Sequence, residues 1–133
     1  MKLEVTKLKQ KVIIPASPKE VYEAFTDPKR HTAFTGSKAS GVAKIDGKFT
    51  AWDGYIFGKY LKFEPGKYLA QEWQTTDWPE GYPPSRFELT FKAVAGGTEI
   101  TMVHSNIPKE QEQELAQGWV EFYWKPLKEY FMK

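Results

Sequence analysis

The stretch that most constrains the fold is the C-terminal one, from residue 109 to residue 131. It predicts a long amphipathic helix, because large apolar side chains recur there in steps of three or four residues and so share one face. These side chains are Leu115, Trp119, Phe122, Pro126 and Tyr130, with Tyr123, Leu127 and Phe131 widening the face. At the α-helical rise such a helix would extend about 35 Å. Its broad aromatic face needs an equally broad apolar surface to pack against.

Pro126 lies inside this predicted helix and complicates it. A proline has no N–H to donate to the carbonyl of Phe122, four residues earlier, so we expect a kink or bend in the helix axis. The bend would let the helix follow a curved sheet, or it would open the mouth of a cavity. The sequence leaves both outcomes open.

Upstream of the helix, the sequence predicts a first strand over residues 3–14 and then two short helices. Ser17-Pro18-Lys19-Glu20 has the pattern of a capping box with proline at the first helical position. Asp27-Pro28 starts the second short helix, which is expected to end near Gly36. Beyond this helical pair the apolar period changes from about four residues to two.

This period of two predicts strands from residue 40 to residue 105. Two of them, at 42–45 and 48–52, flank the hairpin turn signal Asp46-Gly47. Others follow at 55–64, 68–75 and 87–93. A final strand after these carries Ile100, Met102 and His104 on its inner face. Because strands follow one another directly, we expect one α+β domain over residues 1–133, with an antiparallel sheet of about seven strands. A twisted sheet of this size curls around the terminal helix and leaves a cavity between them.

Composition excludes several classes of protein. The chain is 41% hydrophobic and 16% aromatic, which favours a globular core over disorder. Its 19 basic and 17 acidic residues are interspersed, and a nucleic-acid binder should instead show a concentrated basic stripe. There is no cysteine, so disulfides and thiolate metal sites are excluded, in keeping with a reducing cytoplasm. No signal peptide or apolar span is present, so we expect no membrane association.

A set of motifs in a fixed order runs through nearly the whole chain, from about Val12 to Phe131. They are residues 20–35 (EVYEAFTDPKRHTAFT), Gly47-Lys48-Phe49 with Asp53-Gly54, Trp73, Trp78-Pro79-Glu80-Gly81, Leu89 with Phe91, Thr98-Glu99, Ile107-Pro108 and Gly118-Trp119. With these motifs the chain resembles the C-terminal domain of the activator of heat shock protein 90 ATPase. That domain belongs to the START-like, birch-pollen-allergen type of helix-grip folds.

The resemblance implies a cytoplasmic, co-chaperone-like module that contacts the chaperone and stimulates its ATPase without a catalytic site of its own. The full activator resembles a two-domain protein whose N-terminal domain docks on the middle segment of the chaperone. These 133 residues contain no counterpart of that domain. A lone domain is therefore expected to bind weakly, to bind differently, or to do another job.

The residue inventory for catalysis is thin. The only histidines are His31 and His104, and they form no HExxH or other close metal-binding pair. GxSxG, P-loop and GxGxxG motifs are absent from the sequence, so we expect no enzyme, no metal and no cofactor.

Two groups of residues are candidates for binding. The first is a ligand cavity between sheet and helix, with candidate lining residues Gln71, Trp73, Met102, His104, Trp119, Phe122 and Tyr123. In this reading His104 and Gln71 orient a ligand. The competing interpretation is that both are hydrogen-bonded in place and that the helical aromatics are ordinary core.

The second candidate is the loop from Trp78 to Pro84, whose candidate partner-binding residues are Trp78, Pro79, Glu80 and Tyr82. Exposed Trp and Tyr are frequent binding anchors, but Trp78 could equally fold back as a lid over the sheet edge. Lysines on the first strand (Lys7, Lys9 and Lys11), with Lys2 nearby, either protect a sheet edge from aggregation or dock on an acidic partner.

The sequence therefore leads to two functional hypotheses. The first, which rests on the resemblance, is binding to a heat shock protein 90-type chaperone. The alternative is a carrier or sensor of a small hydrophobic ligand held between sheet and helix. An enzyme using that cavity is a third and less favoured hypothesis.

Overall fold

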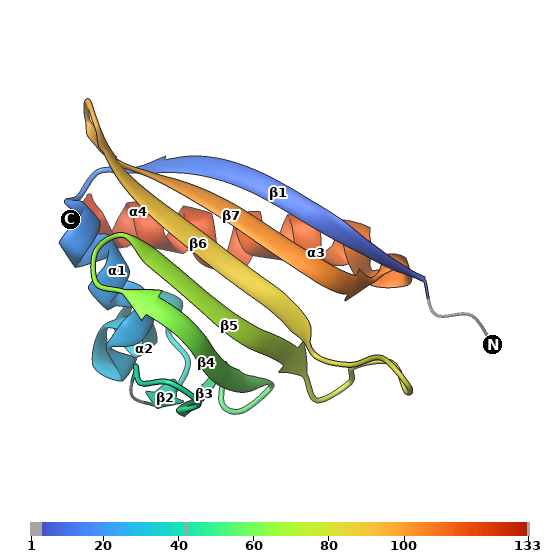
Figure 1. Ribbon diagram of the computed structural model, residues 1–133. Coiled ribbons are helices and arrows are strands. Elements are labelled where there is room, and N and C mark those ends of the chain that lie inside the picture. The colour runs from blue at the N-terminus through green and yellow to red at the C-terminus, as the bar shows by residue number, and fades with distance from the viewer. Residues whose placement is uncertain (1–3, 42, 133) are drawn as a thin grey trace.

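A computed structural model describes residues 4–41 and 43–132 and shows a curved sheet with a helical segment packed along its concave side (Figure 1). The seven antiparallel strands are β1 (Val5–Ile14), β2 (Ser40–Gly41), β3 (Lys48–Ala51), β4 (Ile56–Glu64), β5 (Tyr68–Thr75), β6 (Ser85–Val94) and β7 (Gly97–Pro108). Their order across the sheet is β1-β7-β6-β5-β4-β3-β2. Strands β2 to β7 form the predicted meander, and the last strand, β7, also pairs with the first, β1. The α+β prediction is confirmed.

The two short helices begin where their caps were predicted. In α1 (Pro18–Thr26) the side chain of Ser17 accepts from the backbone N–H of Glu20, and the Glu20 side chain bonds back to the cap. In α2 (Pro28–Thr35) Asp27 caps the N-terminus, and Gly36 ends the helix in the left-handed conformation with φ 80°. Both helices lie at one end of the sheet, beside the end of the terminal helix (Figure 1).

The predicted strand at 42–45 is wrong in position. The strand is Ser40–Gly41, and it pairs with Thr50 and Phe49; Val42 lies outside the described residues. The reason lies in the turn at Asp46-Gly47. The N–H of Asp46 bonds to the carbonyl of Tyr60, and the N–H of Tyr60 bonds to the carbonyl of Gly47, both at 2.9 Å. The turn is thus bound to β4 and does not close a tight hairpin between β2 and β3.

The inner face of the sheet is largely apolar. Leu69, Leu89, Ile100 and Met102 are fully buried there, as the alternation predicted. Within the described residues, no helix is long and apolar enough to cross a membrane.

The C-terminal segment is one continuous helical rod of four parts. A short 3₁₀ turn, η1 (Lys109–Gln111), leads into α3 (Glu112–Trp119), a π-helical turn η2 (Val120–Trp124) and α4 (Lys125–Phe131). In η2 the N–H of Lys125 bonds to the carbonyl of Val120, five residues earlier. This wider turn directly precedes Pro126, where the normal four-residue bond has no donor.

The extra residue in the π turn rotates the buried face of the helix, so one part of the predicted face is wrong. Phe122 belongs to the predicted packing face, but its side chain is 52% exposed. Trp124, which the four-residue spacing did not select, is 4% exposed and packs in the core. Trp119 and Trp124 are five residues apart, and one helical face accommodates both because the turn between them is π-helical.

Candidate functional site

A groove of about 400 Å³ opens between the helical rod and the end of the sheet formed by β4 and β5. Its lining residues come from the turn after β3, from β4 and β5, from the loop after β5, and from η1, α3 and η2: Trp52, Tyr55, Ile56, Trp73, Thr75, Asp77, Gln111, Glu114, Leu115, Gly118, Trp119, Phe122 and Tyr123. Its volume lies within the usual range of small-molecule sites. The groove lies between sheet and helix, where the sequence predicts a ligand cavity.

The floor of the groove is a set of buried aromatic rings. The ring centroids of Trp73 and Trp119 are 5.5 Å apart, and those of Trp119 and Tyr123 are 4.8 Å apart. On its other side Trp119 stacks on Phe87, with centroids 4.6 Å apart and planes 6° from parallel. Because each ring is held on several sides, the floor is preformed.

The walls of the groove are half-exposed aromatic and aliphatic side chains. Phe122 meets the edge of Trp52 at a centroid distance of 5.6 Å, so the helix and the turn after β3 touch across the groove. Trp52 has φ 54° and Asp53 has φ 56°. A left-handed backbone is rare for a residue as large as Trp, and such strain often accompanies functional sites. Between the walls Gly118 leaves space, since a Cβ placed there would meet nothing nearer than Phe122 at 3.9 Å.

The rim of the groove carries negative charge. Oδ1 of Asp77 accepts hydrogen bonds from the hydroxyls of Thr75 at 2.7 Å and Tyr55 at 2.8 Å. These two bonds, with the larger effect from Thr75, hold the pKa of the Asp77 carboxyl below its usual range. Glu114 lies on the helical side of the groove and is exposed. The groove thus presents one carboxylate from the end of the sheet and one from the helix.

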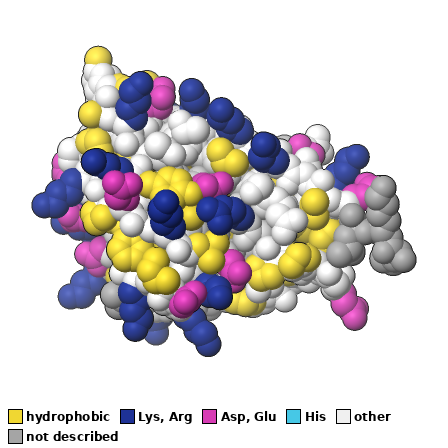
Figure 2. Space-filling view, viewed as in Figure 1, with side chains coloured by type: hydrophobic (Ala, Val, Ile, Leu, Met, Phe, Trp, Pro, Cys, Tyr) yellow, Lys and Arg dark blue, Asp and Glu magenta, His cyan; other side chains and the backbone are white. Residues whose placement is uncertain are grey.

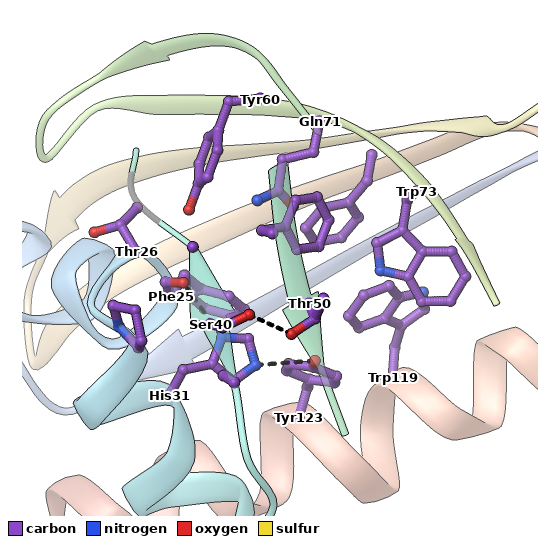
Figure 3. Close-up of a pocket in the computed structure, with 15 residues that line it drawn as sticks. Phe25, Thr26, His31, Ser40, Thr50, Tyr60, Gln71, Trp73, Trp119 and Tyr123 are labelled. Atoms are coloured by element: carbon purple, nitrogen blue, oxygen red, sulfur yellow. Dashed lines mark hydrogen bonds between the residues drawn. The ribbon is translucent and has the colours of Figure 1, made fainter. Parts of the chain in front are cut away.

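A second, smaller cavity lies behind the floor (Figure 3). Its volume of about 20 Å³ would hold one water molecule. Gln71 and Tyr60 face it from the sheet, and Ser40 and Thr50 beside it are hydrogen-bonded at 2.6 Å. Trp73, Trp119 and Tyr123 line both spaces and so separate the groove from this cavity.

His31 holds the helical pair against the terminal rod. Its Nδ1 is 3.2 Å from the carbonyl of Phe25 and its Nε2 is 3.0 Å from the hydroxyl of Tyr123. Because a carbonyl only accepts, Nδ1 carries the proton, and Nε2 accepts from Tyr123. Burial, partly opposed by the bond to Phe25, lowers the pKa of His31 to about 4. This side chain is neutral at pH 7.

His104 is the centre of a buried chain of hydrogen bonds. Nε1 of Trp119 donates to Nδ1 of His104 at 3.2 Å, and Oγ of Ser85 is 2.7 Å from Nε2. An indole nitrogen only donates, so the His104 proton is on Nε2 and is donated to Ser85. The Ser85 hydroxyl then donates to the carbonyl of Trp73 at 2.6 Å. Burial lowers the pKa of His104 to about 3.

The structure divides the predicted cavity residues into three groups. The groove is lined by Trp73, Trp119, Phe122 and Tyr123, and the smaller cavity is lined by Gln71. Met102 and His104 are fully buried and line neither space. The prediction that His104 faces a ligand cavity is therefore corrected: the competing interpretation, a histidine hydrogen-bonded in place, describes it.

Several lining residues were missed by sequence reasoning. Trp52 and Tyr55 flank Asp53-Gly54, and this turn dipeptide was a signal that both rings would leave the strand pattern at one sheet end. A glycine inside an amphipathic helix, here Gly118, was a signal of close approach or open space. Asp77 and Glu114 had no local signal, because their proximity depends on how the helix lies across the sheet.

The loop after β5 is not an open aromatic anchor. Trp78 is half-buried, its Nε1 donates to the carbonyl of Pro83 at 3.0 Å, and its ring meets the edge of Trp73 at a centroid distance of 5.9 Å. The backbone N–H of Glu4 donates to the Tyr82 hydroxyl at 3.2 Å. Trp78 therefore folds back on the sheet end, as the second of the two interpretations expected, and Glu80 is exposed at the loop tip.

The strand β1 is an edge of the sheet, and Lys7, Lys9 and Lys11 are exposed along it; Lys2 lies outside the described residues. Figure 2 shows the sheet face turned away from the helices, where Lys and Arg side chains are spread among apolar and acidic ones.

Within residues 4–41 and 43–132, no three His, Asp or Glu side chains are grouped to hold a metal ion.

Comparison with known proteins gives a consistent family. The family model described as Activator of Hsp90 ATPase homolog 1-like protein matches residues 15–132. The chain is 34% identical over 131 residues to the activator of 90 kDa heat shock protein ATPase homolog 1 of Mus musculus, covering 98% of this chain and 38% of that protein. The Homo sapiens protein of the same description is 33% identical over 131 residues. The chain thus spans 38% of the length of these two relatives.

Solved structures share the fold. The crystal structure of an HSP90 activator from Plasmodium falciparum has a TM-score of 0.83 and 24% identity, over 94% of this chain and 95% of that chain. A protein of the dynemicin biosynthetic locus has a TM-score of 0.80 and 23% identity, over 96% of this chain and 47% of that chain. At these identities the likeness concerns the fold alone, and it confirms the predicted helix-grip architecture.

Proposed function

The chain belongs to the Activator of Hsp90 ATPase homolog 1-like family, and on that premise we propose that it is a cytoplasmic, non-catalytic domain that binds a heat shock protein 90-type chaperone and alters its rate of ATP hydrolysis. The observation that carries this proposal is the 34% identity to the mouse activator over nearly the whole chain. The absence of a catalytic role is supported by the two histidines, because both are buried, neutral and hydrogen-bonded on both ring nitrogens.

We place the chaperone contact on the loop after β5 and the adjoining outer face of the sheet. Prolines at 79, 83 and 84 lower the conformational freedom of this loop, so less entropy is lost on binding. Trp78 packs against Trp73 and so holds the loop on the sheet end, and the exposed side chain of Glu80 is accessible to a partner. The contact is expected to be of modest affinity, because this chain corresponds to 38% of the relative's length.

The test is the ATP turnover of a purified heat shock protein 90 as the chain is added. We expect a change in rate that saturates at micromolar concentrations of the chain. Reversing the charge at the loop tip with Glu80→Lys should weaken the effect several-fold, whereas Glu121→Lys on the exposed side of the helical rod should leave it unchanged. An unchanged rate up to high micromolar concentrations, together with no detectable binding, would overturn the proposal.

The groove supports a second candidate function, which is the binding of a small hydrophobic molecule. The specific observation is an open space of about 400 Å³ with a preformed aromatic floor. Gly118→Leu would place a side chain into this space without removing any core atom. We expect the neutral fluorescent probe N-phenyl-1-naphthylamine to bind the natural chain and to lose binding in this variant. Equal binding by both proteins would show that the probe does not use the groove.

A further inference from the structure

We propose that the groove selects organic cations, that is, flat apolar molecules carrying an ammonium group. This inference rests on the second candidate function, ligand binding in the groove, and specifies the ligand class. It is carried by the charges of the rim and by the aromatic rings of the walls, which favour the same sign of charge.

The charges lining the groove are of one sign. Asp77 and Glu114 are among its lining residues, and Lys, Arg and His are not. The chain as a whole has more basic than acidic residues, 19 against 17, so this imbalance does not follow from composition. The ion pairs among the described residues, which use Glu4, Glu23, Asp27, Asp46 and Glu88, include neither rim carboxylate. Both carboxylates are therefore available to a bound cation.

The two carboxylates act on the same part of the groove. Asp77 holds the hydroxyl of Tyr55 from the sheet side, at 2.8 Å. The negative charge of Glu114, on the helix side, also acts on Tyr55 and helps to raise its pKa, although burial and the bond to Asp77 are larger causes. Tyr55 thus lies within the field of both groups. Hydrogen bonds from Thr75 and Tyr55 fix Oδ1 of Asp77, so the orientation of this carboxylate is set before a ligand arrives.

The walls strengthen the preference for a cation. Trp52, Tyr55 and Phe122 are partly exposed on the groove, and an aromatic face attracts a cation that lies within about 6 Å of its centroid. The buried rings of Trp73 and Trp119 form the floor on which a flat apolar body would lie. A ligand with an aromatic body at the floor and an ammonium group at the rim matches both features. An anion of the same shape would meet two like charges.

Three probes that share one ring system test the inference: 2-naphthylmethylamine, which is a cation at pH 7, the neutral 2-naphthalenemethanol and the anion 2-naphthoate. Binding is measured by titration calorimetry at low ionic strength. We expect the amine to bind about tenfold more tightly than the alcohol, from a rim contact and a cation–π contact together, and the anion to bind most weakly. Salt should reduce the preference for the amine, because the rim is exposed.

Variants show where the preference arises. Asp77→Asn and Glu114→Gln keep the shape of each side chain, and we expect each to weaken amine binding about threefold while leaving the alcohol unchanged. Glu121→Gln, outside the groove, should change neither. Gly118→Leu should abolish binding of all three probes.

Two results would overturn the inference, and they differ in what they leave standing. If the alcohol binds as tightly as the amine, or if the preference survives in the double variant D77N/E114Q, the groove is a plain apolar site and the ligand hypothesis stands without the cation. If no probe binds, or if binding persists in G118L, the ligand hypothesis fails and the inference fails with it.

Discussion

At the scale of single residues, the best-defined feature is the hydrogen-bond chain through His104. Ser85 accepts from His104 and donates to Trp73, so it satisfies a buried ring N–H and a buried carbonyl at once. We expect Ser85→Ala to destabilise the fold by about 1–3 kcal/mol, because a buried polar group without its partner keeps the full cost of desolvation. Urea denaturation measures the loss. Ser105→Ala, at a half-exposed position of β7, is the control. Equal losses of stability in the two variants would contradict the role of Ser85 in the hydrogen bonds through His104.

The two buried histidines predict how stability depends on pH. Both have pKa values lowered by burial, His31 to about 4 and His104 to about 3, from an unfolded value of 6.5. Below pH 6.5 the histidines bind protons in the unfolded chain but stay unprotonated in the folded chain, so the free energy of unfolding falls as pH falls. The loss is about 1.4 kcal/mol per pH unit for each histidine between pH 6.5 and 4.

Two measurements check this. Urea denaturation at pH 7 and pH 5.5 gives the slope, and the ring-carbon NMR signals of the histidines should stay unshifted between pH 8 and 5.5. A histidine signal that titrates near pH 6.5 in the folded protein would contradict the buried, neutral assignment.

The residue scale also shows what a single sequence can predict about polar groups. The alternation of β7 placed Ile100, Met102 and His104 on the inner face, and the structure confirms this. The partners of His104 were not predictable, because Ser85 comes from β6 and Trp119 from the terminal rod. Local periodicity gives the direction of a side chain, but a hydrogen-bond partner depends on the tertiary contacts between elements.

At the scale of elements, two glycines have opposite roles. A Cβ on Gly58 in β4 would collide with the backbone carbonyl of Glu72 in the neighbouring strand, whereas one on Gly118 in α3 would face open space. We expect Gly58→Ala to destabilise the domain by about 3 kcal/mol, through steric strain at the sheet. Gly118→Ala should stabilise it by up to about 1 kcal/mol, because alanine is the better helix former. Urea denaturation of both variants measures the difference, and a stabilising Gly58→Ala would contradict the close approach of β4 and β5.

Element boundaries followed the sequence where local chemistry determined them. The capping box at Ser17 placed α1, the Asp27-Pro28 cap placed α2, and the period of two placed β5 at Tyr68–Thr75 as predicted. The two errors had different causes. The turn at Asp46-Gly47 is bound to Tyr60 of β4, and the π turn before Pro126 exchanges Phe122 for Trp124 on the buried face. A strict four-residue period does not predict a π turn, which adds one residue to a turn of the helix.

At the scale of the whole molecule, the two ends of the chain are joined across the core. The side chain of Gln10 in β1 donates to the carbonyl of Ala116 at 3.0 Å and accepts from Nε1 of Trp124 at 2.7 Å. Strand β1 is also paired along β7 from Val5 to Ile14. The helical rod that forms one side of the groove is thereby tied to the sheet that forms the other. We expect sheet and rod to unfold together as one cooperative unit.

This cooperativity determines what a groove ligand should do to thermal unfolding. A ligand that bridges sheet and rod binds the folded state only, so at 100 times its Kd it should raise the free energy of unfolding by about 2.7 kcal/mol. For a chain of this size that corresponds to an increase in Tm on the order of 10 °C. Scanning calorimetry with 2-naphthylmethylamine should therefore show one transition, displaced as a whole. The G118L variant should show no displacement, since its groove is filled. A shift of equal size in both proteins would mean that the amine binds elsewhere, and a split transition would mean that the rod unfolds apart from the sheet.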